Sequence, residues 1–118
     1  MEPIEPTTNT STSNSTFGSS GTTRIDITRG DGATLKIQGT NSTNPGATAQ
    51  NIKVDGTPDD LWRWITDGGQ VKVASNGAQI FSTSNMTYAY YPAASSTNRA
   101  TITVFDKVLK LEWLKIRF

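Results

Sequence analysis

The densest pattern of apolar positions in this chain lies at its C-terminal end, over the last 20 residues. Ile102 and Val104 alternate there with threonines, and alternation with period two is typical of a β-strand with one buried face. A helix is the competing interpretation, because Leu109, Trp113 and Ile116 are also spaced for one helical face. The β-branched and aromatic residues of the segment favour strands.

The alternation changes phase once within this segment. Leu111 and Trp113 are apolar at odd positions, whereas Leu114, Ile116 and Phe118 carry the apolar face at even positions. One extra residue of this kind is what a β-bulge introduces, and a bulge bends its strand. We therefore predict that the alternation which starts at position 108 runs to the C-terminus as strand, with a bulge at Trp113 and Leu114.

Shorter alternating runs upstream indicate further strands. Hairpins are predicted over residues 23–38 and 70–83, the second with an Asn-Gly pair at the two central positions that favour positive φ. Short strands are predicted at residues 51–55 and 86–91. The segment from residue 39 to residue 50 is polar and rich in turn-forming residues, so we expect a long loop there.

One short helix is predicted over residues 57–67. Thr57 provides the N-cap, Pro58 the first helical position, and two glycines after Asp67 a left-handed end. Three residues share the predicted inward stripe: Leu61, Trp64 and Ile65. Trp62 lies on the shoulder of this stripe, where we expect it to be the more exposed of the two helical tryptophans.

The first 23 residues have a different character. From Thr7 to Thr23, 16 of 17 residues are Ser, Thr, Asn or Gly, and such a segment buries too little apolar surface to offset the entropy of ordering it. We predict a flexible arm over residues 1–23, with Phe17 as its one apolar anchor, and a small β-domain over residues 24–118. The fold class is therefore all-β, mainly an antiparallel sandwich or barrel, with one short helix.

The amino-acid composition excludes several classes of function. The chain has 118 residues, a net charge of +1, no Cys and no His, so the usual zinc sites, thiol nucleophiles and Ser-His-Asp arrangements have no residues to form them. We expect no enzyme activity, no cofactor, no nucleic acid and no membrane. The N-terminal residues lack the basic start and apolar core of a signal peptide, so no secretion is expected.

Several acidic residues and one tripeptide are candidates for a metal, catalytic or recognition site. Asp55, Asp59 and Asp60 lie close together in sequence, but their spacing fits no calcium loop that we know and helix capping explains two of them. Asp55 and Asp67 form an acid pair that nothing in the sequence places across a cleft. The Arg-Gly-Asp sequence at residues 29–31 matches an integrin-recognition tripeptide, and we interpret it as an ordinary hairpin turn.

Aromatic residues provide a second candidate site. Trp62, Tyr88 and Tyr90 could form a stacking platform for sugar rings, since Tyr88 and Tyr90 point the same way on a strand and Tyr91 points the other way. For both tryptophans, packing in the core is the favoured interpretation.

In its overall organisation, the chain resembles the small decoration or cement proteins that reinforce tailed-phage capsids. The resemblance rests on the arm from Thr7 to Thr23, the turn-rich strands from Arg24 to Tyr91, and the apolar end strand to Phe118. It implies a virion structural protein, often trimeric, whose arm lies across neighbouring coat-protein subunits. Phe17, Leu114, Ile116 and Phe118 are then the expected interface residues. The alternative is a carbohydrate- or receptor-binding β-module that uses Trp62, Tyr88 and Tyr90.

Overall fold

A computed structural model of the chain describes residues 16–92 and 99–118. These residues form nine strands and one helix: β1 Thr16–Phe17, β2 Thr23–Thr28, β3 Thr34–Asn41, β4 Gln50–Lys53, α1 Pro58–Thr66, β5 Lys72–Val73, β6 Gln79–Ser82, β7 Met86–Tyr91, β8 Thr101–Asp106 and β9 Leu111–Arg117. The strands join in one mixed sheet in the order β1-β3-β4-β9-β8-β7-β6-β5, and β2 pairs with β3 outside this path. The predicted β fold class with a single short helix is confirmed.

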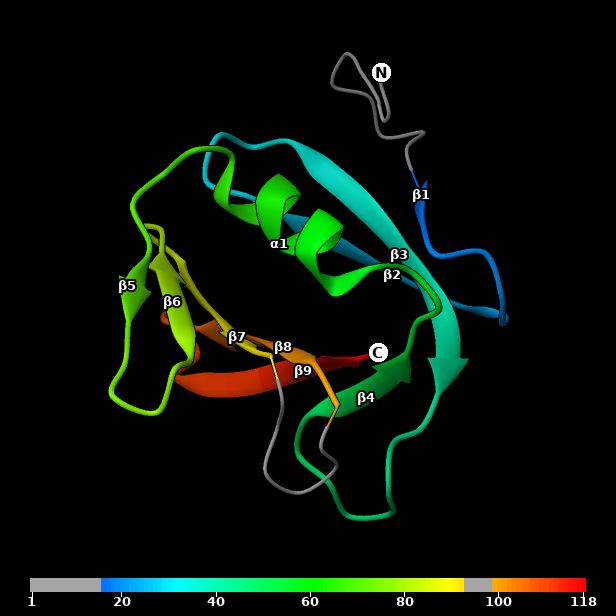
Figure 1. Ribbon diagram of the computed structural model, residues 1–118. Coiled ribbons are helices and arrows are strands. Elements are labelled where there is room, and N and C mark those ends of the chain that lie inside the picture. Colours follow the sequence, from blue (N-terminus) through cyan, green and yellow to red (C-terminus); the bar gives the residue numbers. More distant parts are fainter. Residues whose placement is uncertain (1–15, 93–98) are drawn as a thin grey trace.

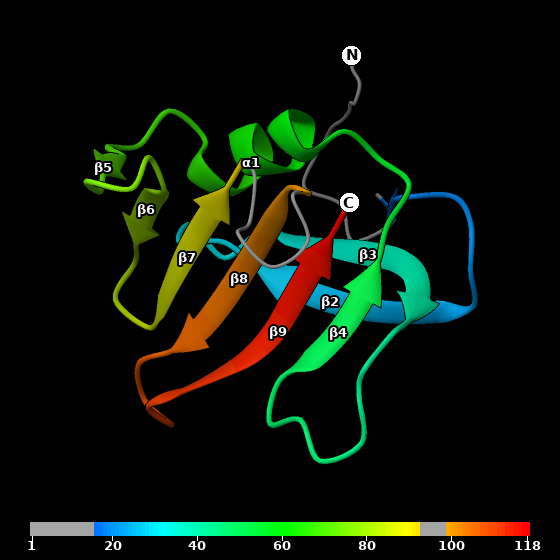
Figure 2. The same cartoon turned by 60° about the horizontal axis from the view of Figure 1, so that its bottom comes forward.

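The sheet folds over on itself through its longest strand. The first part of β3 pairs antiparallel with β2, and its last residues, Thr40 and Asn41, pair with β4. Figure 2 shows the consequence: β2 and β3 cross behind β8, β9 and β4 at a steep angle. Six of the eight strand pairs are antiparallel, and the parallel ones are β1 with β3 and β4 with β9.

Helix α1 lies along one side of the space between the two layers (Figure 1). Its first position is Pro58, and it ends where Asp67 adopts a left-handed conformation with φ 40°. The predicted bounds are therefore confirmed, although the Thr57 side chain makes no capping hydrogen bond. One core cluster unites residues of β2, β3, β4, α1, β7, β8 and β9 with Val54: Ile27, Leu35, Ile37, Ile52, Val54, Leu61, Trp62, Ile65, Tyr88, Tyr90, Ile102, Val104, Leu114 and Ile116.

The C-terminal segment forms a strand pair, and the predicted bulge lies where the phase of the sequence changes. Val104 is paired with Leu114 and Phe105 with Glu112, so Trp113 has no partner in β8 and is the extra residue. A helix in this segment is excluded. The strand does not begin at position 108 as predicted, because residues 107–110 form the turn between β8 and β9.

The hairpin at residues 70–83 forms with a different turn from the one predicted. Of its central pair only Gly77 has positive φ, at 87°, and Asn76 does not. The Asn76 side chain instead accepts a hydrogen bond from the backbone N–H of Ala78 at 3.0 Å. Side-chain bonding of this kind is typical of Asn in turns and fixes the turn without a second left-handed residue.

Candidate functional site

The predicted aromatic platform is part of the core. Trp62 and Tyr90 are 6% exposed, and Tyr88 is 1% exposed, so none of the three rings presents a face to a ligand. The rings of Trp62 and Tyr90 lie 5.6 Å apart, and the Trp62 indole donates a hydrogen bond to the Gln79 side chain at 3.0 Å. The prediction that Trp62 is more exposed than Trp64 is wrong, since Trp62 packs under β6 and β7 while Trp64 is half-buried.

The two buried phenols are held by hydrogen bonds to two different elements, β2 and α1. Tyr88 donates to the backbone carbonyl of Thr28 at the end of β2, and Tyr90 donates to Asp59 Oδ1 in the first turn of α1 at 2.9 Å. Burial raises the pKa of each phenol to about 12, and for Tyr90 the hydrogen bond and charge of Asp59 add to this effect. These tyrosines therefore connect the layers and are not placed as ligand contacts.

The predicted interface on the last strand is also largely internal. Leu114 and Ile116 are 0% exposed and belong to the core cluster. They cannot contact a partner of the folded domain, so the prediction for these two residues is corrected. Their burial follows from the position of β9 between β4 and β8, with α1 and the β2–β3 layer over its inner face. Only Phe118, beyond the end of β9, is partly exposed.

Phe17 contacts its own domain. β1 pairs parallel with β3, and the Phe17 ring packs edge to face on Phe118 with ring centres 6.2 Å apart. Its ring also lies directly over Gly56, where any added Cβ would overlap it. The sequence analysis predicts Phe17 as the anchor of a flexible arm. In the structure, its side chain instead packs on the domain, against Phe118 and Gly56.

A second contact fixes the next residues of this segment. Asp55 accepts two hydrogen bonds from Ser19, one from the backbone N–H at 2.9 Å and one from the hydroxyl at 2.7 Å. These bonds lower the pKa of the Asp55 carboxyl, because they stabilise its charged form. The Gln38 side chain adds a hydrogen bond to the carbonyl of Gly21 at 2.9 Å. Residues 16–23 thus lie on the domain, and the predicted arm before Thr16 falls outside the described residues.

The acidic residues around α1 do not converge on a site. Asp59 is hydrogen-bonded to Tyr90, Asp60 pairs with Arg63 at 2.9 Å, and Asp55 faces Ser19. Within residues 16–92 and 99–118, acidic side chains nowhere gather in a group of three or more that could hold a metal ion. Each of these carboxylates has a structural partner.

The Arg-Gly-Asp turn is closed onto the helix. Arg29 is only 19% exposed in its side chain: its guanidinium lies 4.7 Å from the centre of the Trp64 ring and donates to the Trp64 carbonyl at 3.1 Å. The same group binds Asp31 at 2.9 Å, and this hydrogen bond lowers the pKa of Asp31. Arg29 and Asp31 are thus bonded to each other, as expected for a structural turn.

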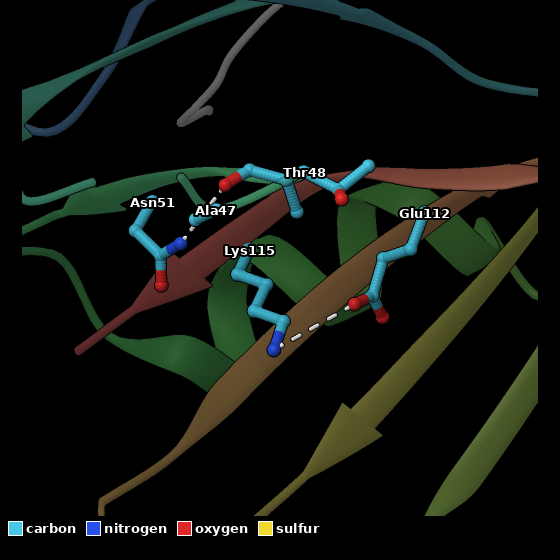
Figure 3. Close-up of a pocket in the computed structure, with 6 residues that line it drawn as sticks. Ala47, Thr48, Asn51, Glu112 and Lys115 are labelled. Carbon is cyan, nitrogen blue, oxygen red and sulfur yellow. Dashed lines mark hydrogen bonds and ion pairs between the residues drawn. The ribbon is translucent and has the colours of Figure 1, made fainter. Parts of the chain in front are cut away.

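An open pocket lies beside β4 and β9 (Figure 3). It has a volume of about 320 Å³ and is lined by Ala47, Thr48, Ala49, Asn51, Glu112 and Lys115. The bulge at Trp113 puts Glu112 and Lys115 on the same face, where they form an ion pair at 3.7 Å. Asn51 donates to the Ala49 carbonyl and accepts from Arg117. The charged pair of this pocket is therefore internal to it, and the Asn51 amide is already bonded to the protein.

The feature that sequence reasoning missed is the turn at residues 107–110. Its two central residues, Val108 and Leu109, are 72% and 65% exposed, the first exceeding every other large apolar side chain in the described part of the protein. The alternation predicts strand for both residues, because they continue it. The signal for a turn is Asp106, the last residue of β8, because an Asp at the end of a strand often starts a turn by accepting backbone hydrogen bonds.

Comparison with known proteins assigns the chain to no family. Searches against protein-family models, curated proteins and solved structures found no match to this chain. In the described part of the chain, no helix has the length and apolar character needed to cross a membrane.

Proposed function

We propose that this chain is a non-enzymatic virion structural protein, which binds coat-protein subunits and stabilises a capsid or related phage assembly. The observation that carries the proposal is the fixed base of the N-terminal segment. Phe17 packs over Gly56 and against Phe118, and Ser19 is bound to Asp55. The polar residues before Thr16 therefore continue from a defined point on a compact β-domain.

This arrangement suits a protein that adds an arm to a neighbouring surface. A segment rich in Ser, Thr and Asn pays an entropic cost when a partner orders it, so each arm binds weakly by itself. Many copies on a symmetric shell combine such weak contacts, and the rigid connection to the domain raises the effective concentration of each arm at its site. We propose that the chain acts as a homo-oligomer, because its 34% apolar content gives a small core that identical copies would supplement. A trimer is the copy number that the resemblance to phage decoration proteins implies.

The carbohydrate- or receptor-binding alternative depended on Trp62, Tyr88 and Tyr90. All three residues are buried. The Trp62 indole nitrogen and the two tyrosine hydroxyls all make hydrogen bonds inside the domain. No observation on the described residues favours this function over the structural one.

The test is binding to empty shells assembled from the major coat protein that is encoded in the same genome as the chain. The full chain and a variant without residues 1–15 are incubated with shells, and the bound fraction is measured by co-sedimentation. The full chain should saturate the shells, and the shortened chain should bind at least about tenfold more weakly, since contacts of the arm are lost. Light scattering on the free protein tests the expected trimer.

A control separates loss of the arm from loss of the fold. The shortened chain keeps Phe17, Ser19 and their partners, so its thermal midpoint should match that of the full chain. A full chain that does not sediment with the shells would overturn the proposal. Equal binding of the two chains would show that the arm is not the contact.

A further inference from the structure

The turn that connects β8 to β9 presents an unusual surface. Its four residues are Lys107, Val108, Leu109 and Lys110, and all four are exposed. Val108 and Leu109 are 72% and 65% exposed, and a lysine stands on each side of them. Tight turns normally carry Gly, Asn, Asp or Ser, so two adjacent aliphatic side chains at such a turn need an explanation beyond turn geometry.

The turn is held in place by hydrogen bonds. Asp106 Oδ1 accepts from the backbone N–H groups of Val108 at 2.8 Å and of Leu109 at 2.9 Å. The backbone N–H of Lys110 donates to the Asp106 carbonyl at 2.7 Å, and Lys110 adopts the left-handed conformation at φ 58°. Because the backbone is fixed in this way, the two aliphatic side chains cannot turn toward the core.

A neighbouring loop supports the same turn. The backbone N–H of Lys107 donates to the carbonyl of Asn85 at 2.9 Å, and its side-chain ammonium donates to the carbonyl of Thr83 at 2.6 Å. The turn is therefore preorganised on both sides, which lowers the entropic cost of binding through it.

We propose that this turn is a docking tip, which inserts Val108 and Leu109 into an apolar hollow edged by carboxylates on a coat-protein subunit. This inference rests on the proposed function and names the contact that the domain makes. The aliphatic pair supplies the buried centre of the contact, and Lys107 and Lys110 select an acidic rim.

The chemistry of the tip favours a protein partner over a membrane. Two aliphatic side chains have fewer carbon atoms than a myristoyl chain, which by itself gives only marginal membrane binding, and the tip has no Trp or Tyr for the lipid interface. A second copy is also disfavoured, because two small convex tips that meet each other bury far less area than a stable dimer needs.

The position of the tip complements that of the arm. The turn precedes β9, whereas the base of the arm packs on Phe118 beyond the other end of β9. Figure 2 shows the β8–β9 turn and the C-terminus at opposite ends of that strand. Arm and tip therefore contact different places on the shell, so that one domain bridges two sites.

The experiment compares variants of the full chain in the shell-binding measurement. Replacing both aliphatic residues, Val108→Ser with Leu109→Ser, should weaken binding about 100-fold, because two buried side chains are lost from the contact. Lys110→Glu should weaken binding about tenfold at low salt and less at high salt, since salt screens the interaction with the acidic rim. Val73→Ser is the matched control: Val73 is 71% exposed but lies on edge strand β5, and its replacement should leave binding unchanged.

Each outcome has a distinct meaning. If the unmodified chain does not bind shells, the proposed function fails and the tip contact fails with it. If it binds and the double variant binds equally well, the tip is excluded while the proposed function stands. Binding of the unmodified chain to vesicles of phosphatidylserine and phosphatidylcholine, lost in the double variant, would overturn the protein partner in favour of a membrane. A dimer by light scattering that the double variant abolishes would overturn it in favour of self-association.

Discussion

Two pairs of aliphatic residues on the C-terminal hairpin have opposite surroundings. Leu114 and Ile116 on β9 are 0% exposed, whereas Val108 and Leu109 in the preceding turn are 72% and 65% exposed. Both pairs belong to one apolar stretch of sequence, and the two leucines are only five positions apart. Apolar character alone therefore does not decide which residues of this hairpin form the core.

The difference lies in what covers each pair. β9 has a strand on either side, and its inner face is in the same core cluster as residues of α1, β2 and β3. The turn lies past the last paired residues of the hairpin, Asp106 and Leu111, where its backbone is held by Asp106 itself. Burial thus requires a second layer, and exposure at the turn marks surface that remains available to another molecule.

The largest expected effect on stability comes from truncating a residue of the buried pair. Leu114→Ala should lower the free energy of unfolding by about 2–5 kcal/mol, because it removes buried methyl groups and leaves a cavity between the layers. Leu109→Ala is the matched control and should change it by less than about 0.5 kcal/mol, since Leu109 is mostly in water. Urea denaturation measures both values. Equal losses for the two variants would contradict the contrast between core and turn.

High pH should lower the free energy of unfolding through the two buried phenols. Below pH 10, Tyr88 is neutral in the folded and the unfolded chain, and its contribution is fully present. Between pH 10 and about 12 the phenol ionises only in the unfolded chain, so folding loses up to about 3 kcal/mol through Tyr88. Tyr90 acts in the same direction. Denaturation curves at pH 9 to 12 measure the loss.

Two variants isolate the role of Tyr88 in this pH dependence. Tyr88→Phe should show a smaller alkaline loss, at the expense of about 1 kcal/mol near neutral pH for its hydrogen bond to Thr28. Tyr91→Phe retains both buried phenols and should retain the alkaline loss. A Tyr88→Phe chain with unchanged pH dependence would show that burial of this phenol does not control alkaline unfolding.

The smallest effect concerns a buried polar atom in the same sheet. The hydroxyl of Thr101 is buried and, in the described structure, has no hydrogen-bond partner. Thr101→Val keeps the β-branched shape and removes this hydroxyl, so the free energy of unfolding should rise by about 1 kcal/mol. Thr103→Val, on the same face of β8, has no such isolated oxygen to remove and should be close to neutral. A destabilised Thr101→Val chain would refute this account of the site.

Sequence reasoning succeeded where the cause of a structure is local. Pro58 begins α1, and the helix ends at Asp67, directly before the two glycines that predict its end. The phase change in the apolar pattern locates the bulge at Trp113. Sequence reasoning failed for the two helical tryptophans, because Trp64 on the predicted inward stripe is half-buried and Trp62 on its shoulder is buried. Contacts with Gln79 and Tyr90 bury Trp62, while Arg29 packs on Trp64, and these partners are distant in sequence.

The candidate sites show the same division. The sequence correctly predicted that Tyr88 and Tyr90 share a face, since alternation along a strand requires it. It could not predict that this face is the inner one, nor that Phe17 packs over Gly56 instead of remaining with the arm. These outcomes depend on which layers pack together. The apolar pattern of one strand does not show which other element packs on its face.

By itself, then, the sequence determined most of the strands from β2 to β8, the helix ends, the bulge and the lack of His and Cys, because each depends on neighbouring residues or on residue type. Tertiary structure alone decided that Leu114 and Ile116 belong to the core and that Val108 and Leu109 face solvent. The physical reason is that burial is a property of two surfaces in contact, and the second surface of each pair comes from a distant part of the chain or, at the turn, from no part of the chain that the structure describes.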